Sequence, residues 1–163
     1  MLKQADEKFM CCVDTNFIEG TVLRNIEKGS WKIKIKDNQR LKALNDCNCL
    51  LFINDINVYE IKNKLLKDFN VPFTKLDEIY NSALCVFTKI KVIRIGEIKI
   101  NPSLVNWMLK HKLALVDGLL IDIAQKVELP FVTSERKAKE WKKAYEGIMT
   151  QDEFWKVIRK IST

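Results

Sequence analysis

The chain has 163 residues and a net charge of +7, and 47% of its residues are hydrophobic. This composition excludes a disordered chain and suits one domain with its own core. The longest apolar runs are much shorter than the roughly 20 residues of a membrane-spanning helix, and the N-terminal MLKQADEKF lacks the apolar segment of a signal peptide, so a cytoplasmic protein is expected.

The first elements alternate a buried strand with a helix. Residues 9–13 (FMCCV) are a fully apolar run, typical of a strand buried on both faces of a parallel sheet. The polar trio 14–16 can cap a following helix, whose apolar spacing continues to Ile26. Residues 31–36 alternate apolar residues with lysine, which predicts a half-exposed strand or hairpin arm. We therefore expect 28–46 to be a hairpin excursion from the main sheet.

The rest of the chain continues this alternation. Apolar or alternating runs predict strands at 49–53, 90–95 and 131–133. Apolar spacing of three and four residues predicts helices at 56–69, 74–87, 101–110, 113–127, 136–145 and 151–161. This order predicts a single domain over 1–163, an α/β fold with a mostly parallel central sheet between two helical layers. Ligands of such sheets bind beyond the carboxyl ends of the strands.

Four carboxylates are candidates for that edge. Asp14 directly follows the first strand, Glu135 comes two residues after the fourth, and Glu60 and Asp117 lie on the intervening helices. Clustered carboxylates repel each other unless a cation neutralises them, so their convergence would predict a hard divalent ion, Mg²⁺ or Mn²⁺.

Each acid also has a simpler local explanation. Asp14 can cap a helix, Glu60 and Glu135 can be solvated, and Asp117 suits the first turn of a helix. Asp117 is the least easily explained in this way, because its neighbours are almost all apolar. Asp122 lies about 140° further around the same helix and is only a reserve ligand.

Four segments that contain these acids resemble the signature motifs of the PIN-domain nucleases, a family that includes VapC-like ribonucleases. The resemblance covers about residues 9–140, and the segments are VDTN (13–16), INDINVYE (53–60), LVDGLLIDIA (115–124) and LPFVTSE (129–135).

The resemblance implies roles for the site residues. Asp14, Glu60 and Asp117 would be metal-ligating catalytic acids, and Asn16 and Ser134 would be supporting polar groups. Glu135 would take the place of the fourth acid, which is usually aspartate. Its extra methylene moves the carboxylate by about 1.5 Å. In addition, a closing C-terminal strand is common in the family, whereas the C-terminal segment here predicts a helix.

The implied activity is metal-dependent hydrolysis of phosphodiester bonds, most often in single-stranded or structured RNA. Relatives act as toxins of toxin–antitoxin pairs, inhibited by a partner peptide, or in RNA processing, and homodimers are common. The alternative is a non-catalytic PIN-like module that binds RNA or protein, with an eroded fourth acidic position.

Basic residues fit an RNA partner. The lysines and arginines are concentrated in 30–44, in 88–112 and directly after Glu135, where Arg136, Lys137 and Lys139 would border the acids. Such residues contact phosphates and supply affinity without sequence information. A solvated, lysine-rich helix face is the competing explanation for each cluster.

Other chemistries fit the sequence less well. The five cysteines match no CxxC spacing and His111 is the only histidine, which disfavours a zinc site. A phosphatase of the haloacid dehalogenase type needs an acid at the position of Asn16, and a response-regulator receiver needs an acidic pair and a lysine that are not in place. The lack of GxGxxG after a strand disfavours a dinucleotide site.

Overall fold

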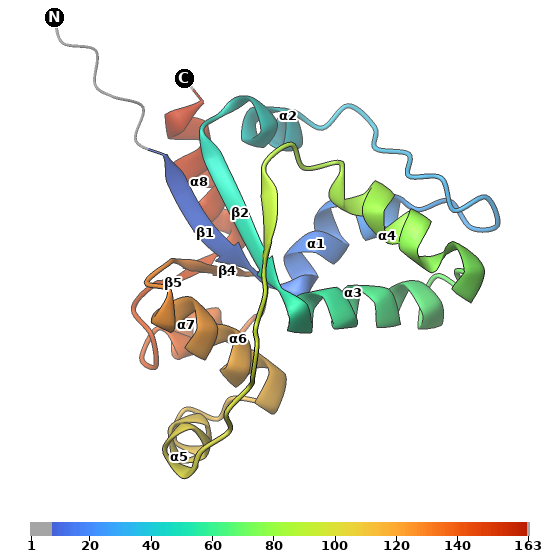
Figure 1. Ribbon diagram of the computed structural model, residues 1–163. Coiled ribbons are helices and arrows are strands. Elements are labelled where there is room, and N and C mark those ends of the chain that lie inside the picture. Colours follow the sequence, from blue (N-terminus) through green and yellow to red (C-terminus); the bar gives the residue numbers. More distant parts are fainter. Residues whose placement is uncertain (1–7, 163) are drawn as a thin grey trace, which may run out of the picture.

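The protein folds around a five-stranded sheet in which all strands are parallel, in the order β3-β2-β1-β4-β5. The computed structural model describes residues 8–162 (Figure 1). Most of the N-terminal segment 1–9, in which no signal peptide is expected, therefore lies outside the described residues. The strands are β1 (Phe9–Val13), β2 (Cys49–Asn54), β3 (Ile90–Ile93), β4 (Phe131–Thr133) and β5 (Ile148–Thr150).

Helices cover both faces of this sheet. The α-helices are α1 (Thr15–Thr21), α2 (Gln39–Asp46), α3 (Asp55–Lys67), α4 (Leu76–Leu84), α5 (Pro102–Lys110), α6 (Leu115–Lys126), α7 (Ala138–Trp141) and α8 (Gln151–Ile161). Two short 3-10 turns, η1 (Leu23–Asn25) and η2 (Phe73–Lys75), precede the excursion and α4. Within residues 8–162, no helix is long and apolar enough to cross a membrane.

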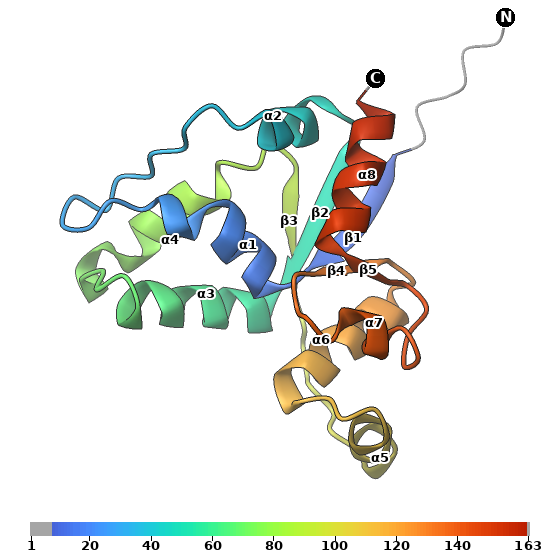
Figure 2. The same cartoon turned by 180° about the vertical axis from the view of Figure 1, so that it is seen from behind.

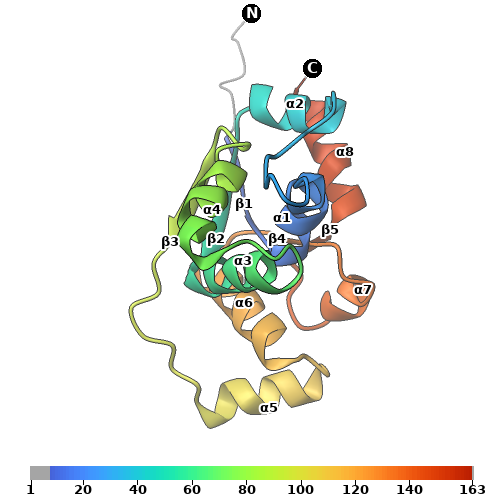
Figure 3. The same ribbon diagram turned by 90° about the vertical axis from the view of Figure 1, so that its right-hand side faces the viewer.

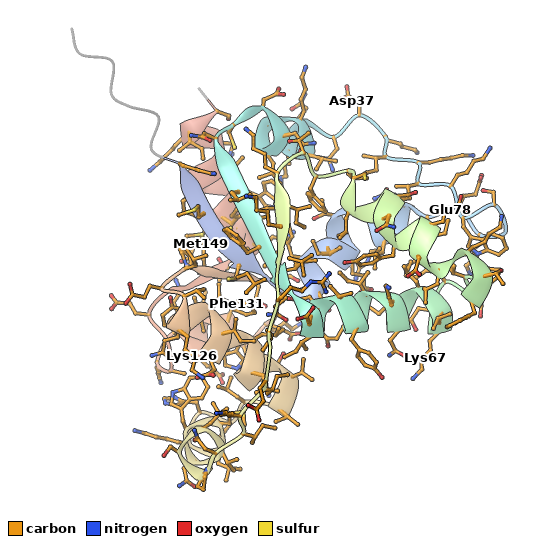
Figure 4. The ribbon with its side chains drawn as sticks, viewed as in Figure 1. Asp37, Lys67, Glu78, Lys126, Phe131 and Met149 are labelled. Atoms are coloured by element: carbon orange, nitrogen blue, oxygen red, sulfur yellow. The ribbon has the colours of Figure 1, made fainter. Side chains whose placement is uncertain are left out.

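Alternation along the strands divides the core into two layers. Cys11 and Val13 point into a cluster with α1, α2, α3, α4 and α8, whereas Cys12 points into a second cluster with α5, α6 and α7. Phe131 and Met149, labelled in Figure 4, likewise belong to opposite clusters. Figure 3 shows the two groups of helices on either side of the strands. The expected three-layer α/β/α sandwich is therefore confirmed.

Strand register brings the ends of β1 and β4 together. Val13 pairs with Val132, and the Asp14 backbone N–H donates to the Val132 carbonyl at 3.0 Å. The residue after β1 therefore lies beside Thr133, the last residue of β4. This edge is the one at which the sequence places its acids.

The excursion differs from the sequence prediction. Residues 31–36 form no strand, and a single antiparallel bridge joins Ile26 to Ile33. The predicted strand is therefore absent, and the hairpin is reduced to this bridge, flanked by backbone hydrogen bonds of 2.9 Å from Glu27 to Lys32 and from Lys34 to Asn25. Trp31, Ile33 and Ile35 pack against the core from a segment that is otherwise an extended loop. The same excursion contains α2, which begins where the Asn38 side chain accepts hydrogen bonds from the first-turn N–H groups.

The C-terminal part contains a strand that the sequence analysis omitted. β5 runs parallel to β4 and pairs Thr150 with Thr133, so the expected departure from a closing strand is wrong. The predicted helix at 136–145 is reduced to α7, while α8 occupies the range expected for the C-terminal helix. A three-residue strand offers too few positions for a period-two pattern to stand out.

A capping box fixes the start of α8. The Glu153 N–H donates to Thr150 Oγ1 at 3.3 Å, and the Thr150 N–H donates to Glu153 Oε2 at 2.8 Å. Thr150→Ala is expected to lower the free energy of unfolding by about 1 kcal/mol. Urea denaturation measures this change, with the exposed Thr74→Ala as control. Equal stability of the two variants would contradict a role for the cap.

Candidate active site at the carboxyl edge of the sheet

Asp14 lies buried at the junction of β1 and α1, with a side chain that is part of the fold. It is 5% exposed and caps α1, because Oδ1 accepts from the Phe17 N–H at 2.6 Å. Its other oxygen, Oδ2, accepts from the Thr133 hydroxyl at 2.5 Å. The cap role and the site role expected from the sequence therefore fall on the same carboxylate.

Burial makes the charged form of Asp14 costly. It raises the pKa of the carboxyl to about 6 from the ordinary 3.8, and the negative charge of Glu135 adds a small increase. Hydrogen bonds from the Thr133 hydroxyl and from the backbone N–H groups of Phe17 and Ser134 oppose this shift. The charged form of Asp14 is therefore still destabilised relative to an exposed carboxylate, although it accepts three hydrogen bonds.

Asp117 is the second acid with a raised pKa. It lies half-buried in the first turn of α6, and burial raises its pKa to about 6. Repulsion from Glu135 and then Glu60 adds to the shift, while Lys137 opposes it. Glu135 therefore influences both Asp14 and Asp117, and Glu60 influences Asp117, although the four acids come from four separate segments.

Close packing beneath Asp117 fixes the position of α6. A β-carbon at Gly118 would lie 2.1 Å from Met108 Sδ, so only glycine lets the buried Met108 side chain of α5 pack so closely. The helix α5 therefore supports the turn that carries Asp117.

Glu60 is held by a chain of hydrogen bonds. Its Oε2 accepts from the Thr15 hydroxyl at 2.6 Å, and Thr15 Oγ1 in turn accepts from the buried Asn57 Nδ2 at 3.2 Å. Asn57 is itself fixed at the start of α3, because its Oδ1 accepts from the Asn54 N–H. Thr15 therefore orients Glu60 directly, and Asn57 does so through Thr15.

Glu135 is held by hydrogen bonds to Asn16 and Thr133. Its Oε1 accepts from Asn16 Nδ2 at 2.7 Å, and its backbone N–H donates to Thr133 Oγ1 at 3.0 Å. Asn16 therefore supports the fourth acid directly. Thr133 links that acid to Asp14, because its oxygen serves both.

A cleft of about 440 Å³ opens beside Glu135, whereas Asp14, Glu60 and Asp117 are not among the residues that line it. It is lined by Asn16, Glu19, Gly20, Arg24, Ser134, Glu135, Arg136, Lys137 and Gln151. Of the predicted supporting and RNA-binding residues, Asn16, Ser134, Arg136 and Lys137 line it, whereas Lys139 is exposed on α7. Ser134 reaches Asp14 through its backbone N–H rather than its hydroxyl.

The donor set has the chemistry of a magnesium or manganese site. The four acids offer only oxygen, the ligand that these ions prefer. Within residues 8–162, no three acidic, histidine or cysteine side chains are close enough to hold one metal ion directly. Mg²⁺ usually keeps several waters and binds one or two carboxylates, so the residues fit a hydrated ion better than an all-protein cage.

Sequence reasoning missed the threonines and the asparagine that hold the acids. Thr15, Asn57 and Thr133 are buried polar residues, and buried polar groups need partners. The available signal was their position: Thr15 follows Asp14, and Thr133 ends the strand before Glu135. Arg24 was missed as well, because it enters the cleft from η1.

The fold has a solved counterpart. The chain is similar to the crystal structure of PAE2754 from Pyrobaculum aerophilum, with a TM-score of 0.54 and 14% sequence identity over 93% of this chain and 98% of that one. At this identity the likeness extends to the fold alone. No protein-family model and no curated protein matches the sequence.

The support of Glu60 can be tested through stability. Thr15→Val should lower the free energy of unfolding by about 1.5 kcal/mol, because it leaves the buried Asn57 amide without its acceptor. Thr15→Ser keeps a hydroxyl and should recover most of that loss. Urea denaturation distinguishes the two variants, and a loss in Thr15→Ser as large as in Thr15→Val would contradict the assignment of the loss to the hydroxyl.

Proposed function

We propose that this protein is a metal-dependent ribonuclease of the PIN-domain type. The observation that carries the proposal is two acids, Asp14 after β1 and Asp117 in the first turn of α6, whose charged forms are made costly chiefly by burial and further by the charge of Glu135. Asp14 and Asp117 both have a pKa raised to about 6, and Glu60 and Glu135 contribute to these shifts. Carboxylates gathered at such an energetic cost are typical of a functional site rather than a structural one.

Asp14 and Asp117 are the acids that would hold Mg²⁺ or Mn²⁺, with Glu60 and Glu135 contacting its waters. When bound, the ion would polarise the scissile phosphate and lower the pKa of a water molecule. A bound cation would also favour the charged forms of Asp14 and Asp117 and so offset the cost that burial and the neighbouring acids impose on them.

The side chains around the acids have their own tasks in this proposal. Thr15 and Asn16 keep Glu60 and Glu135 apart and oriented, each through one hydrogen bond. Arg136 and Lys137, beside Glu135 in the cleft, would bind the phosphates that flank the scissile bond. No serine, cysteine or histidine nucleophile is required.

The wider biological role follows the family expectation. A toxin or an RNA-processing role, an antitoxin-type protein partner for the toxin case, and a homodimer are all proposals that rest on the resemblance in sequence. The proposed substrate is single-stranded or structured RNA.

A cleavage assay tests the proposed activity. The purified protein is incubated with a labelled single-stranded RNA in Mg²⁺ or Mn²⁺, with EDTA as control. We expect fragments that form only with the metal. RNA binding without cleavage under all metal conditions would contradict the nuclease and favour the non-catalytic PIN-like module.

A further inference from the structure

Four of the five arginines of this protein line surface pockets. Only five of the 28 basic residues are arginines. One of them, Arg94, forms an ion pair with Asp55 at 2.7 Å. The other four line two surface pockets: Arg24 and Arg136 in the cleft beside Glu135, and Arg40 and Arg159 in a second pocket.

The second pocket lies between α2 and α8 and has a volume of about 350 Å³. The Arg40 guanidinium lies over the Trp155 ring, 5.9 Å from its centroid, and Arg159 Nε donates to the Trp155 carbonyl at 3.4 Å. Both arginines are exposed, and within residues 8–162 neither forms an ion pair with a carboxylate. They are therefore positioned on an aromatic support and remain able to bind an anion.

The two pockets share one stripe of α8. Gln151 lines the cleft beside Glu135, while Trp155 and Arg159 line the second pocket. Spacings of four and eight residues place these side chains on the same helix face, and eight residues correspond to about 12 Å of helix. Figure 2 shows α8 on the face that also carries α1 and α2, the helices that form the opposite walls.

The residue type favours phosphate as the ligand. Arginine binds phosphate through two parallel hydrogen bonds and stacks on aromatic rings, as Arg40 does on Trp155. Trp155 is only 5% exposed, so its ring supports the arginine and does not present a face for a base. Two arginine pockets along one helix stripe suit a ligand with repeated phosphates.

We propose that these four arginines form a phosphate-binding track for single-stranded RNA. The track runs from the cleft beside Glu135, along α8, to the pocket between α2 and α8. It rests on the proposed function, since it takes RNA as the strand that the acids would cut. Two acids, Glu19 and Glu135, share the cleft with two of these arginines. Glu19 pairs with Lys64 at 2.7 Å and with Arg24 at the longer distance of 3.8 Å, so its charge is shared between the two cations.

A binding experiment distinguishes specific binding by the track from non-specific attraction of RNA to a positively charged protein. The 163-residue chain carries Asp14→Asn and is kept in EDTA, so that RNA is bound without being cut. Fluorescence anisotropy with a labelled 12-nucleotide oligouridylate compares Arg40→Gln/Arg159→Gln with the control Lys67→Gln/Lys75→Gln, in which Lys75 lies over the Trp31 ring much as Arg40 lies over Trp155. Both pairs remove two exposed charges, and Lys67 lies at the far end of α3 (Figure 4).

The track predicts that the arginine pair weakens binding about tenfold, whereas the lysine pair changes it less than twofold. The salt slope, log K against log[salt], should become shallower by about 1.4 in the arginine pair, because each phosphate contact on a single strand contributes about 0.7. Equal weakening by both pairs, or an unchanged slope in the arginine pair, would overturn the track.

The result is separable from the nuclease proposal. If the arginine pair lowers RNA affinity but the wild-type chain cuts no RNA with any metal, the track stands and the proposed activity fails. If the wild-type chain cuts RNA and the arginine pair binds it normally, the activity stands and the track fails. Thermal unfolding of both variant pairs confirms that the comparison is between folded proteins.

Discussion

Replacing Asp14 or Asp117 by asparagine is expected to reduce metal-dependent RNA cleavage by about a thousandfold. Each change removes a charge that the proposed ion needs, and loss of one electrostatic contact at a reacting centre typically costs 10²- to 10³-fold or more, so about 10³ is expected here. Asparagine keeps the size of the side chain and an oxygen that can accept from the Phe17 N–H at the start of α1. Single-turnover cleavage of a labelled RNA measures the effect.

Two further variants control this experiment. Glu135→Gln should lose only about tenfold, because the fourth acid is proposed to contact the ion through water. Asp37→Asn changes an exposed aspartate in the loop before α2 (Figure 4) and should cleave like the wild type. Wild-type cleavage by Asp14→Asn would remove the acids from the mechanism.

The buried charge of Asp14 should also make stability depend on pH in a defined direction. Its pKa is raised to about 6 in the folded state, against 3.8 ordinarily, so the folded protein binds this proton more tightly than the unfolded chain does. The cost of the charged form is absent below pH 3.8, grows as pH rises towards 6 and is fully present above it. Its upper limit is about 3 kcal/mol of unfolding free energy.

Asp14→Asn should abolish that part of the pH dependence. The stability difference, variant minus wild type, should therefore rise by up to about 3 kcal/mol between pH 4 and pH 7. Chemical denaturation at several pH values measures it, with Asp37→Asn as the exposed control. A difference that stays constant with pH would show that Asp14 carries no buried charge.

Divalent cations should offset the cost of the buried charge of Asp14. At pH 7.5, saturating Mn²⁺ should raise the thermal midpoint of the wild type, because the ion binds the folded state alone. The same addition should leave Asp14→Asn nearly unchanged. Equal stabilisation of both proteins would place the metal elsewhere.

Elements with an unambiguous pattern could be predicted from the sequence. The apolar runs at 9–13 and 49–53 are β1 and most of β2, because a strand buried on both faces tolerates no polar position. The helix after each begins at a polar cap, Asp14 or Asn54, directly beyond the last apolar residue. Because the order of these units predicts a parallel sheet, the edge that collects the acids could be predicted too.

The excursion and the last strand could not be predicted from local patterns. The alternation at 31–36 is the same whether the apolar side chains belong to a strand or to an extended loop that packs on the core, and here it is a loop. β5 is only three residues long, and it becomes a strand because β4 leaves an open edge beside it.

Contacts within the site depend on the fold as a whole. The Thr15–Glu60 bond joins residues 45 positions apart, and the Thr133–Asp14 bond joins residues 119 apart. Their geometry follows from the register of β1 against β4 and the angle of α3, neither of which a motif contains. The sequence could therefore predict the acids but not the hydroxyl and amide groups that hold them.

Calorimetric titration with Mn²⁺ tests the central claim most directly. At pH 7.5 the wild-type chain should bind Mn²⁺ with a dissociation constant in the millimolar range or tighter, typical of a hydrated site with few protein ligands, and Asp14→Asn and Asp117→Asn should each bind at least about tenfold more weakly. Failure of the wild type to bind Mn²⁺ or Mg²⁺ at millimolar concentration, or unchanged affinity in both variants, would contradict a metal site built on these acids.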